Sequence, residues 1–216
     1  REFLYIYEDK NEIKKFLITF KKQNFLHLTG VKYGSEDNMN PLNFYRAVKE
    51  NRLSLSEKNI NDFTYIKLKV FPKLTNLLQE SSVFYKFSPE KGNANWLYID
   101  SFITENQRKK ESVILGITEK GGNTNNYAPS SILRAIPDER GNYIGNVLII
   151  ACRDCNLKKE KYKAIYRVTD VSKIPDELKK DISDLENYNC ITGNPLGYVK
   201  FKNFENRWIA KIDVER

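Results

Sequence analysis

The stretch that organises this chain is Asn24-Phe25-Leu26-His27-Leu28-Thr29-Gly30-Val31-Lys32-Tyr33, which holds the single histidine among 216 residues. Asparagine often caps the start of a helix and glycine often closes its end, so Asn24 and Gly30 predict a short helix. Histidine both accepts and donates protons near neutrality, because its ordinary pKa is about 6.5. His27 is therefore a candidate catalytic residue. The alternative is a half-buried histidine that bonds to a main-chain carbonyl.

The composition indicates a folded, basic protein. Hydrophobic residues make up 40% of the chain, too many for a disordered segment. The formal net charge is +8, which is typical of proteins that bind nucleic acid; a lysine-rich surface due to biased composition is the alternative. No run of residues reaches the roughly 20 apolar positions of a membrane span. The odd count of three cysteines does not suit a disulfide scaffold. We therefore expect a cytoplasmic protein without a membrane partner.

Apolar spacing divides the chain into a helical and a strand-rich portion. Residues 3–7 and 13–20 predict a hairpin. Helical spacing then continues to about residue 80, with Pro41 opening one helix and Pro72 bending another. Five later segments have the composition of strands, and the apolar run 147–150 should lie at the sheet centre. These strands are expected at 83–87, 96–100, 113–118, 143–151 and 161–168.

Helices followed by strands, without βαβ alternation, indicate an α+β fold with a largely antiparallel sheet. We expect a single domain over residues 1–216. Its helical portion spans about 22–80, its sheet portion about 83–168, and a C-terminal extension about 170–216. After residue 193 the chain forms either a last hairpin or a closing helix.

The cysteines give only a weak indication of a metal site. Cys152-Arg153-Asp154-Cys155 is an isolated C-x-x-C motif, whereas a structural zinc site needs four ligands. Cys190 and His27 could complete a set, but no second close pair of ligands supports it. We expect two thiols without a metal, and neither a metal nor a cofactor in the protein.

Two further features point to nucleic acid. Basic residues cluster from Lys10 to Lys32 and from Arg153 to Arg167, with tyrosines interleaved in the second cluster, as suits a phosphate backbone with stacked bases. A solvated, lysine-rich edge strand is the alternative. Residues 125–134 crowd polar side chains around Pro129, where they could hold a phosphate; an irregular loop leading into a short helix capped by Ser130 is the alternative. The candidate RNA-binding residues are Lys21, Lys22, Lys32, Arg134, Lys158, Lys161, Tyr162 and Arg167.

The order of several motifs resembles a known nuclease group. These motifs are Phe20-Lys21-Lys22-Gln23-Asn24-Phe25-Leu26-His27-Leu28-Thr29-Gly30, Asn43-Phe44-Tyr45, Leu53-Ser54, Lys73-Leu74-x-x-Leu77-Leu78, Leu115-Gly116 and Tyr127-x-Pro129-x-Ser131-Ile132-Leu133. Over about residues 13–168 the chain resembles group 4 of the phage-associated barnase–EndoU–colicin E5/D–RelE-like nucleases. The resemblance implies a barnase/RelE-like fold, in which N-terminal helices pack on a small, curved, mostly antiparallel sheet.

The resemblance also implies a metal-independent endoribonuclease with a toxin-like role in a phage or mobile element. In such enzymes the 2′-hydroxyl of the RNA attacks the neighbouring phosphate, with help from a base, an acid and cations. His27 matches the family's histidine as base or acid, and Tyr127 and Ser131 match the later motif, where they would hold or protonate the phosphate. Lys163 is assigned as a fourth catalytic residue from its charge and place. The chain has no second histidine, so another residue type must fill the other proton-transfer role.

Partners and competing functions follow from the same features. The expected partner is RNA, tRNA included, together with an antitoxin or immunity protein that inhibits the enzyme. One alternative is a non-catalytic RNA- or nucleoprotein-binding module of the same fold. The other is an ADP-ribosyltransferase, although no Gly-Thr follows His27 and no glutamate stands clearly at a late strand end.

Overall fold

The computed structural model describes residues 1–32, 40–56, 59–79, 81–91, 98–185, 198–204 and 207–213. The helices within these ranges are short. They are α1 (Asn24–Thr29), α2 (Pro41–Lys49), α3 (Asp62–Val70), α4 (Leu74–Gln79) and α5 (Asp176–Lys179), with the 3-10 turns η3 (Phe71–Lys73), η5 (Pro137–Glu139) and η6 (Val171–Lys173).

The strands make up most of the fold. They are β1 (Glu2–Asp9), β2 (Glu12–Thr19), β3 (Ser54–Leu55), β4 (Ser82–Phe87), β5 (Ser101–Glu105), β6 (Ser112–Lys120), β7 (Asn123–Ala135), β8 (Gly141–Arg153), β9 (Tyr162–Arg167), β10 (Ile182–Ser183), β11 (Tyr198–Phe204) and β12 (Arg207–Asp213).

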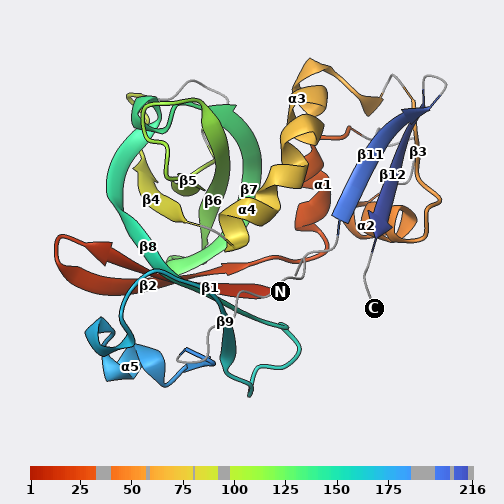
Figure 1. Cartoon of the computed structure of the whole chain (residues 1–216). Helices are drawn as coiled ribbons and strands as arrows, with labels where there is room; N and C mark the ends of the chain where they lie inside the picture. The colour runs from red at the N-terminus through yellow and green to blue at the C-terminus, as the bar shows by residue number, and fades with distance from the viewer. Residues whose placement is uncertain are drawn as a thin grey trace.

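A nine-stranded sheet in the order β1-β2-β7-β6-β5-β4-β8-β9-β10 forms the body of the protein. An additional antiparallel pairing of β1 with β8 closes the first seven of these strands into a ring. The sheet is mixed, because β2 pairs with β7 and β9 with β10 in parallel. In Figure 1 the strands β4 to β8 curve above the β1–β2 hairpin, with α1, α3 and α4 to one side of the ring and α5 below it.

The predicted architecture was wrong. The chain does not place N-terminal helices on a small, curved, mostly antiparallel sheet; it begins with a hairpin that is built into a large mixed sheet, and its helices are few and short. Two pairings cause the difference: β1 joins β8 about 140 residues later in the chain, and β2 joins β7. Local apolar spacing carries no signal for such long-range pairings.

Several local predictions were confirmed. The β1–β2 hairpin forms, α1 spans Asn24–Thr29 and is closed by Gly30, and η3 interrupts the helix at Pro72. The N-cap residue of α1 is Gln23, however, and not Asn24. The helix α2 opens with Pro41, and the Asn40 side chain accepts a hydrogen bond from the main-chain N–H of Asn43 at 2.9 Å. Of the two alternatives left open for the tail, the structure shows the hairpin: β11 pairs with β12, and β12 pairs in turn with β3.

Other local predictions need correction. Residues 125–134 are neither an irregular loop nor a helix but part of the long strand β7. Residues 98–100 are not in a strand, because β5 begins at Ser101; residues 96 and 97 lie outside the described residues. Ser54 and Leu55 form the strand β3 instead of starting a helix.

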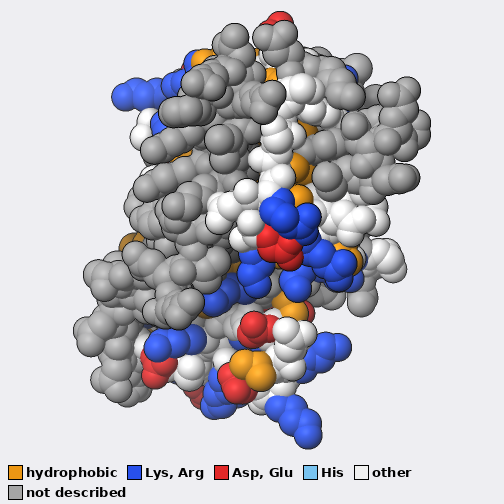
Figure 2. Space-filling view, turned by 90° about the vertical axis from the view of Figure 1, so that its right-hand side faces the viewer, with side chains coloured by type: hydrophobic (Ala, Val, Ile, Leu, Met, Phe, Trp, Pro, Cys, Tyr) orange, Lys and Arg blue, Asp and Glu red, His pale blue; other side chains and the backbone are white. Residues whose placement is uncertain are grey.

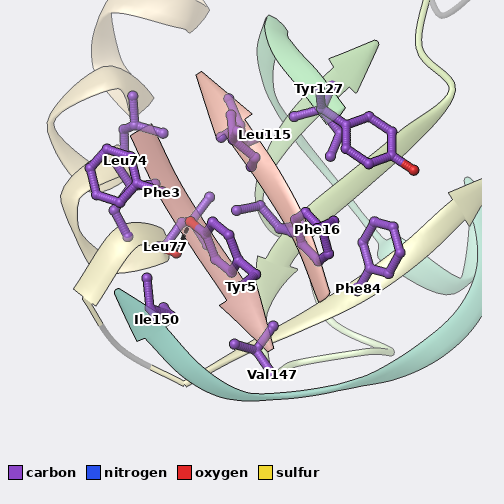
Figure 3. Packing of buried hydrophobic residues seen from close by; sticks show 14 of the residues in the cluster. Phe3, Tyr5, Phe16, Leu74, Leu77, Phe84, Leu115, Tyr127, Val147 and Ile150 are labelled. Carbon is purple, nitrogen blue, oxygen red and sulfur yellow. Dashed lines mark hydrogen bonds between the residues drawn. The ribbon is translucent and has the colours of Figure 1, made fainter. Parts of the chain in front are cut away.

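The largest hydrophobic cluster packs side chains of β1, β2 and β8 against α4 (Figure 3). The Phe16 ring stacks on Tyr5, with centroids 4.8 Å apart, and on Phe84, with centroids 4.4 Å apart. Such aromatic pairs each contribute about 0.5–1.5 kcal/mol beyond the area they bury. The buried Tyr5 hydroxyl donates to the Leu77 carbonyl of α4 at 3.3 Å, which satisfies its polar atom inside the cluster. The N-terminal hairpin is therefore an integral part of the core.

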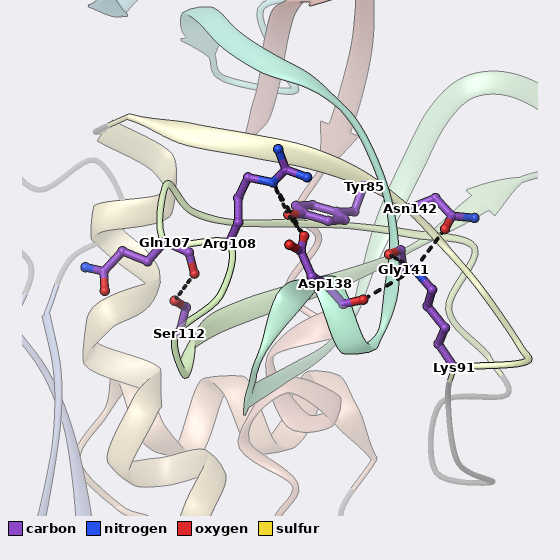
Figure 4. A network of polar contacts seen from close by, with 8 residues as sticks. All are labelled: Tyr85, Lys91, Gln107, Arg108, Ser112, Asp138, Gly141 and Asn142. Carbon is purple, nitrogen blue, oxygen red and sulfur yellow. Dashed lines mark hydrogen bonds and ion pairs between the residues drawn. The ribbon is translucent and has the colours of Figure 1, made fainter.

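A polar network ties β4 to the segment that carries η5 (Figure 4). The Tyr85 hydroxyl donates to Asp138 Oδ1 at 2.7 Å, and Arg108 Nε lies 3.3 Å from the same hydroxyl. Burial and the bond to Asp138 raise the pKa of Tyr85. Lys91 Nζ donates to the Gly141 carbonyl at 3.0 Å. These contacts hold the β7–β8 connection in place.

Candidate functional site

The helix α1 presents His27 to solvent. Its last two residues, Leu28 and Thr29, are buried against the core, whereas His27 is exposed. The helix ends because Gly30 adopts a left-handed conformation, φ 69°, in which its N–H donates to the Leu26 carbonyl at 3.1 Å. The alternative of a half-buried histidine therefore does not fit the structure.

The start of α1 is fastened to β7 through Asn24. Its Oδ1 accepts a hydrogen bond from the Lys21 N–H at 2.8 Å, and its Nδ2 donates to the Pro129 carbonyl at 3.4 Å. Pro129 lies at a bulge, since Gly116 pairs with Ser131 and Ile117 with Pro129, which leaves Ser130 without a partner opposite it on β6. Bulges accommodate proline, which has no N–H for the ladder, and they redirect neighbouring side chains. The bulge therefore brings β7 beside the histidine helix.

His27 and this bulge share a pocket of about 480 Å³. Thr118 and Ser130 both donate their hydroxyls to the main-chain carbonyl of Tyr98, Ser130 at 3.3 Å. Tyr98 is 82% exposed. The two titratable side chains in the lining are thus an imidazole and a phenol. The full lining is His27, Tyr98, Thr118, Ala128, Pro129 and Ser130.

Sequence reasoning missed three of these residues. Tyr98 and Thr118 were assigned only to strands, and Ser130 only to a helix cap. The sequence signal that could have identified this wall of the pocket is Pro129, because a proline in an otherwise extended run indicates an edge strand or a bulge.

Tyr127, one residue before the lining, points into the core (Figure 3). It is 4% exposed and meets Phe16 edge to face, with centroids 5.8 Å apart. Its hydroxyl lies 3.5 Å from Glu119 Oε1, and burial, with a smaller contribution from that carboxylate, raises its pKa to about 12. Neighbouring residues of a strand point to opposite faces, which explains why Ala128 and not Tyr127 lines the pocket.

The other two predicted catalytic residues also lie outside the lining. Ser131 is half-buried and pairs with Gly116. Lys163 is exposed on β9 opposite Cys152 of β8, whereas the pocket is built from α1, β6, β7 and Tyr98. Their catalytic roles stay predictions from the sequence.

The candidate RNA-binding residues are spread over several elements. Lys21 and Lys22 are exposed directly before α1 and Lys32 is exposed after it, and Lys22 Nζ lies 5.8 Å from the centroid of the Tyr45 ring. Arg134 is exposed but pairs with Glu111 at 3.1 Å. Figure 2 shows Lys and Arg side chains gathered on the described part of one face, with acidic side chains among them.

The second basic cluster is partly buried. Tyr162 is 6% exposed and its hydroxyl donates to Glu2 at 3.2 Å, so its ring is not free to stack on a base. Burial first, and the charge of Glu2 second, raise the pKa of Tyr162 to about 12. Lys158 and Lys161 are exposed and Arg167 is half-buried.

The described residues contain no group of three or more His, Cys, Asp or Glu side chains that could hold a metal ion. Cys152 is buried and Cys155 half-buried, while Cys190 lies outside the described residues. Within the same described part of the chain, no helix is long and apolar enough to cross a membrane.

Comparison with known proteins supplies the family. No curated protein and no solved structure matches the chain. A family model described as phage-Barnase-EndoU-ColicinE5/D-RelE like nuclease4 matches residues 1–193. This confirms the resemblance seen in the motifs and extends it to the N-terminal hairpin and to α5. The chain therefore belongs to this phage-associated family of barnase-, EndoU-, colicin E5/D- and RelE-like nucleases.

Proposed function

We propose that this nuclease is a metal-independent endoribonuclease that cleaves RNA by transesterification at the 2′-hydroxyl. The observation that carries the proposal is the place of His27: the chain's sole imidazole is exposed on the wall of a pocket, on a helix whose start is fastened to β7. An imidazole in that position can take a proton from a 2′-hydroxyl without a metal. The family membership supplies a nucleic acid as the substrate class.

In the proposed reaction His27 accepts the proton of the 2′-hydroxyl as that oxygen attacks the adjacent phosphorus. The bond from phosphorus to the 5′-oxygen breaks, and the products are a 2′,3′-cyclic phosphate and a 5′-hydroxyl. The leaving oxygen must receive a proton, so a second group has to act as the acid. Lys21 and Lys22, which precede the helix, are exposed cations that suit the phosphates flanking the scissile bond.

Tyr98 is our candidate for the acid. It is the other titratable side chain in the pocket lining, and two hydroxyls hold its main chain there. Tyr98→Phe keeps the ring and removes the hydroxyl. An acid role predicts that this variant loses cleavage rate, whereas a role in base stacking alone predicts that it keeps the rate and that Tyr98→Ala weakens binding.

The proposal is tested by incubating purified protein with single-stranded RNA in excess EDTA and identifying the new chain ends. Cleavage with cyclic phosphate ends supports it, and a 2′-deoxy substitution at the cut site should abolish the cut. Binding of RNA without cleavage would instead support the non-catalytic module. Consumption of NAD would support the ADP-ribosyltransferase.

The biological role we propose is that of a toxin from a phage or mobile element, acting on cytoplasmic RNA, tRNA included, and restrained by an antitoxin or immunity protein. Induced expression should then arrest growth of a bacterial host, and His27→Ala should relieve that arrest. Arrest by the His27→Ala protein at equal abundance would argue against it.

A further inference from the structure

Lys67 is a buried lysine that contacts the histidine segment from behind. It lies on α3 and is only 5% exposed. Its Nζ donates to the main-chain carbonyl of His27 at 3.1 Å. That carbonyl belongs to the last turn of α1, where carbonyls have no partner within the helix. Lys67 therefore satisfies an otherwise open acceptor directly at the histidine.

Lys67 is tightly fitted between α3 and the end of α1. Its Nζ stands 4.8 Å from the centroid of the Phe63 ring, and its Cδ lies so close to Gly30 that a Cβ there would approach it to 2.7 Å. His27 meets Lys67 through its main-chain carbonyl, and among the described residues no charged side chain contributes to the pKa shift of Lys67. A buried ammonium is costly without a carboxylate partner, and burial lowers the pKa of Lys67 to about 8.

We propose that Lys67 is a positioning residue that holds the last turn of α1, and with it His27, at the wall of the pocket. A helix of six residues is too short to be stable alone, so its placement depends on tertiary contacts. A cation near the C-terminal end of a helix also interacts favourably with the negative end of the helix dipole. The consequence for catalysis rests on the proposed ribonuclease function, whereas the contact itself does not.

The protonation state of Lys67 should change within a measurable pH range. As Lys67 loses its proton near pH 8, a charged donor becomes a neutral one and its bond to the His27 carbonyl weakens. His27 then becomes less well placed, and small displacements of a catalytic group reduce rates strongly. The cleavage rate should therefore fall above about pH 8 for a reason that lies outside the pocket.

The test uses the fact that the chain has one histidine, so its signals in an NMR spectrum need no further assignment. The carbonyl carbon of His27 is followed over pH in the wild type, in Lys67→Met and in the control Lys69→Met. The Lys69→Met substitution removes the same charge from the same helix, but Lys69 is exposed and its Nζ lies over the Tyr65 ring, 4.1 Å from the ring centroid. We expect an inflection near pH 8 in the wild type and in Lys69→Met, and none in Lys67→Met.

Cleavage is measured on the same samples. Lys67→Met should reduce kcat about 10- to 100-fold with little change in KM, and should lose the alkaline fall in rate. Lys67→Arg should restore part of kcat. A His27 carbonyl signal that does not move near pH 8 in the wild type would overturn the proposal even if no variant folds. A wild type that shows the inflection but cuts no RNA would overturn the ribonuclease function and leave the contact standing.

Discussion

Gly30 packs so closely on Lys67 that a Cβ atom added to it would lie 2.7 Å from the lysine Cδ. The same glycine adopts φ 69°, which L-residues with a side chain rarely adopt. The glycine of the His-Leu-Thr-Gly element is therefore constrained twice, by the end of α1 and by the buried lysine behind it. The motif encodes the placement of the helix as well as the histidine.

Replacing Gly30 with alanine should destabilise the protein by more than the conformational penalty alone. Gly121 provides the control, because it has a similar φ of 62° but nothing within 4 Å of an added Cβ. Gly121→Ala should cost about 1–2 kcal/mol, the usual penalty for a left-handed residue. Chemical denaturation should show a clearly larger loss for Gly30→Ala. Equal losses would mean that the contact with Lys67 imposes no constraint.

Lys67 should make stability depend on pH. The folded protein releases the proton of Lys67 at about pH 8, whereas the unfolded chain keeps it up to the ordinary value of 10.5. Between these values the unfolded state binds more protons, so the free energy of unfolding rises with pH. The rise due to this group is at most about 3 kcal/mol.

The matching measurement is the difference between wild type and Lys67→Met in denaturant unfolding from pH 7 to 10.5. The methionine variant should be more stable at pH 7, and its advantage should shrink as pH rises through 8. An advantage that stays constant, or that grows with pH, would contradict the assignment of a lowered pKa to Lys67.

Nucleic-acid affinity should fall steeply with salt, because exposed lysines such as Lys21 and Lys22 would bind phosphates and release counterions. Fluorescence anisotropy with a labelled RNA between about 50 and 200 mM salt measures the slope. Lys22→Ala should lower affinity and reduce that slope. An affinity independent of salt would remove phosphate contacts as the main source of binding.

The sequence predicted the parts of the site that depend on neighbours in the chain. The helix that carries His27 starts at Asn24 and is closed by Gly30, as expected, although Gln23 and not Asn24 is its N-cap residue. The family was recognisable from the order of the motifs. The other wall was not predictable in this way. Tyr98 and Ser130 come together because the bulge at Pro129 redirects β7, and that bulge is defined only by pairing with β6.

The size of the sheet was missed for the same reason. The pairing of β1 with β8 joins Tyr5 to Ile150, and no periodicity within either segment specifies its partner. Likewise, the alternation along β7 decides that Tyr127 faces the core, but the alternation becomes visible only once the segment is known to be a strand.

The most direct measurement of the central claim compares wild type with His27→Ala for RNA cleavage in excess EDTA and for melting temperature on the same samples. His27 is exposed, so its removal should change the free energy of unfolding by less than about 0.5 kcal/mol. Loss of the general base should reduce the cleavage rate about 10²- to 10⁴-fold. A His27→Ala protein that cuts RNA at the wild-type rate would contradict the account, whatever its melting temperature.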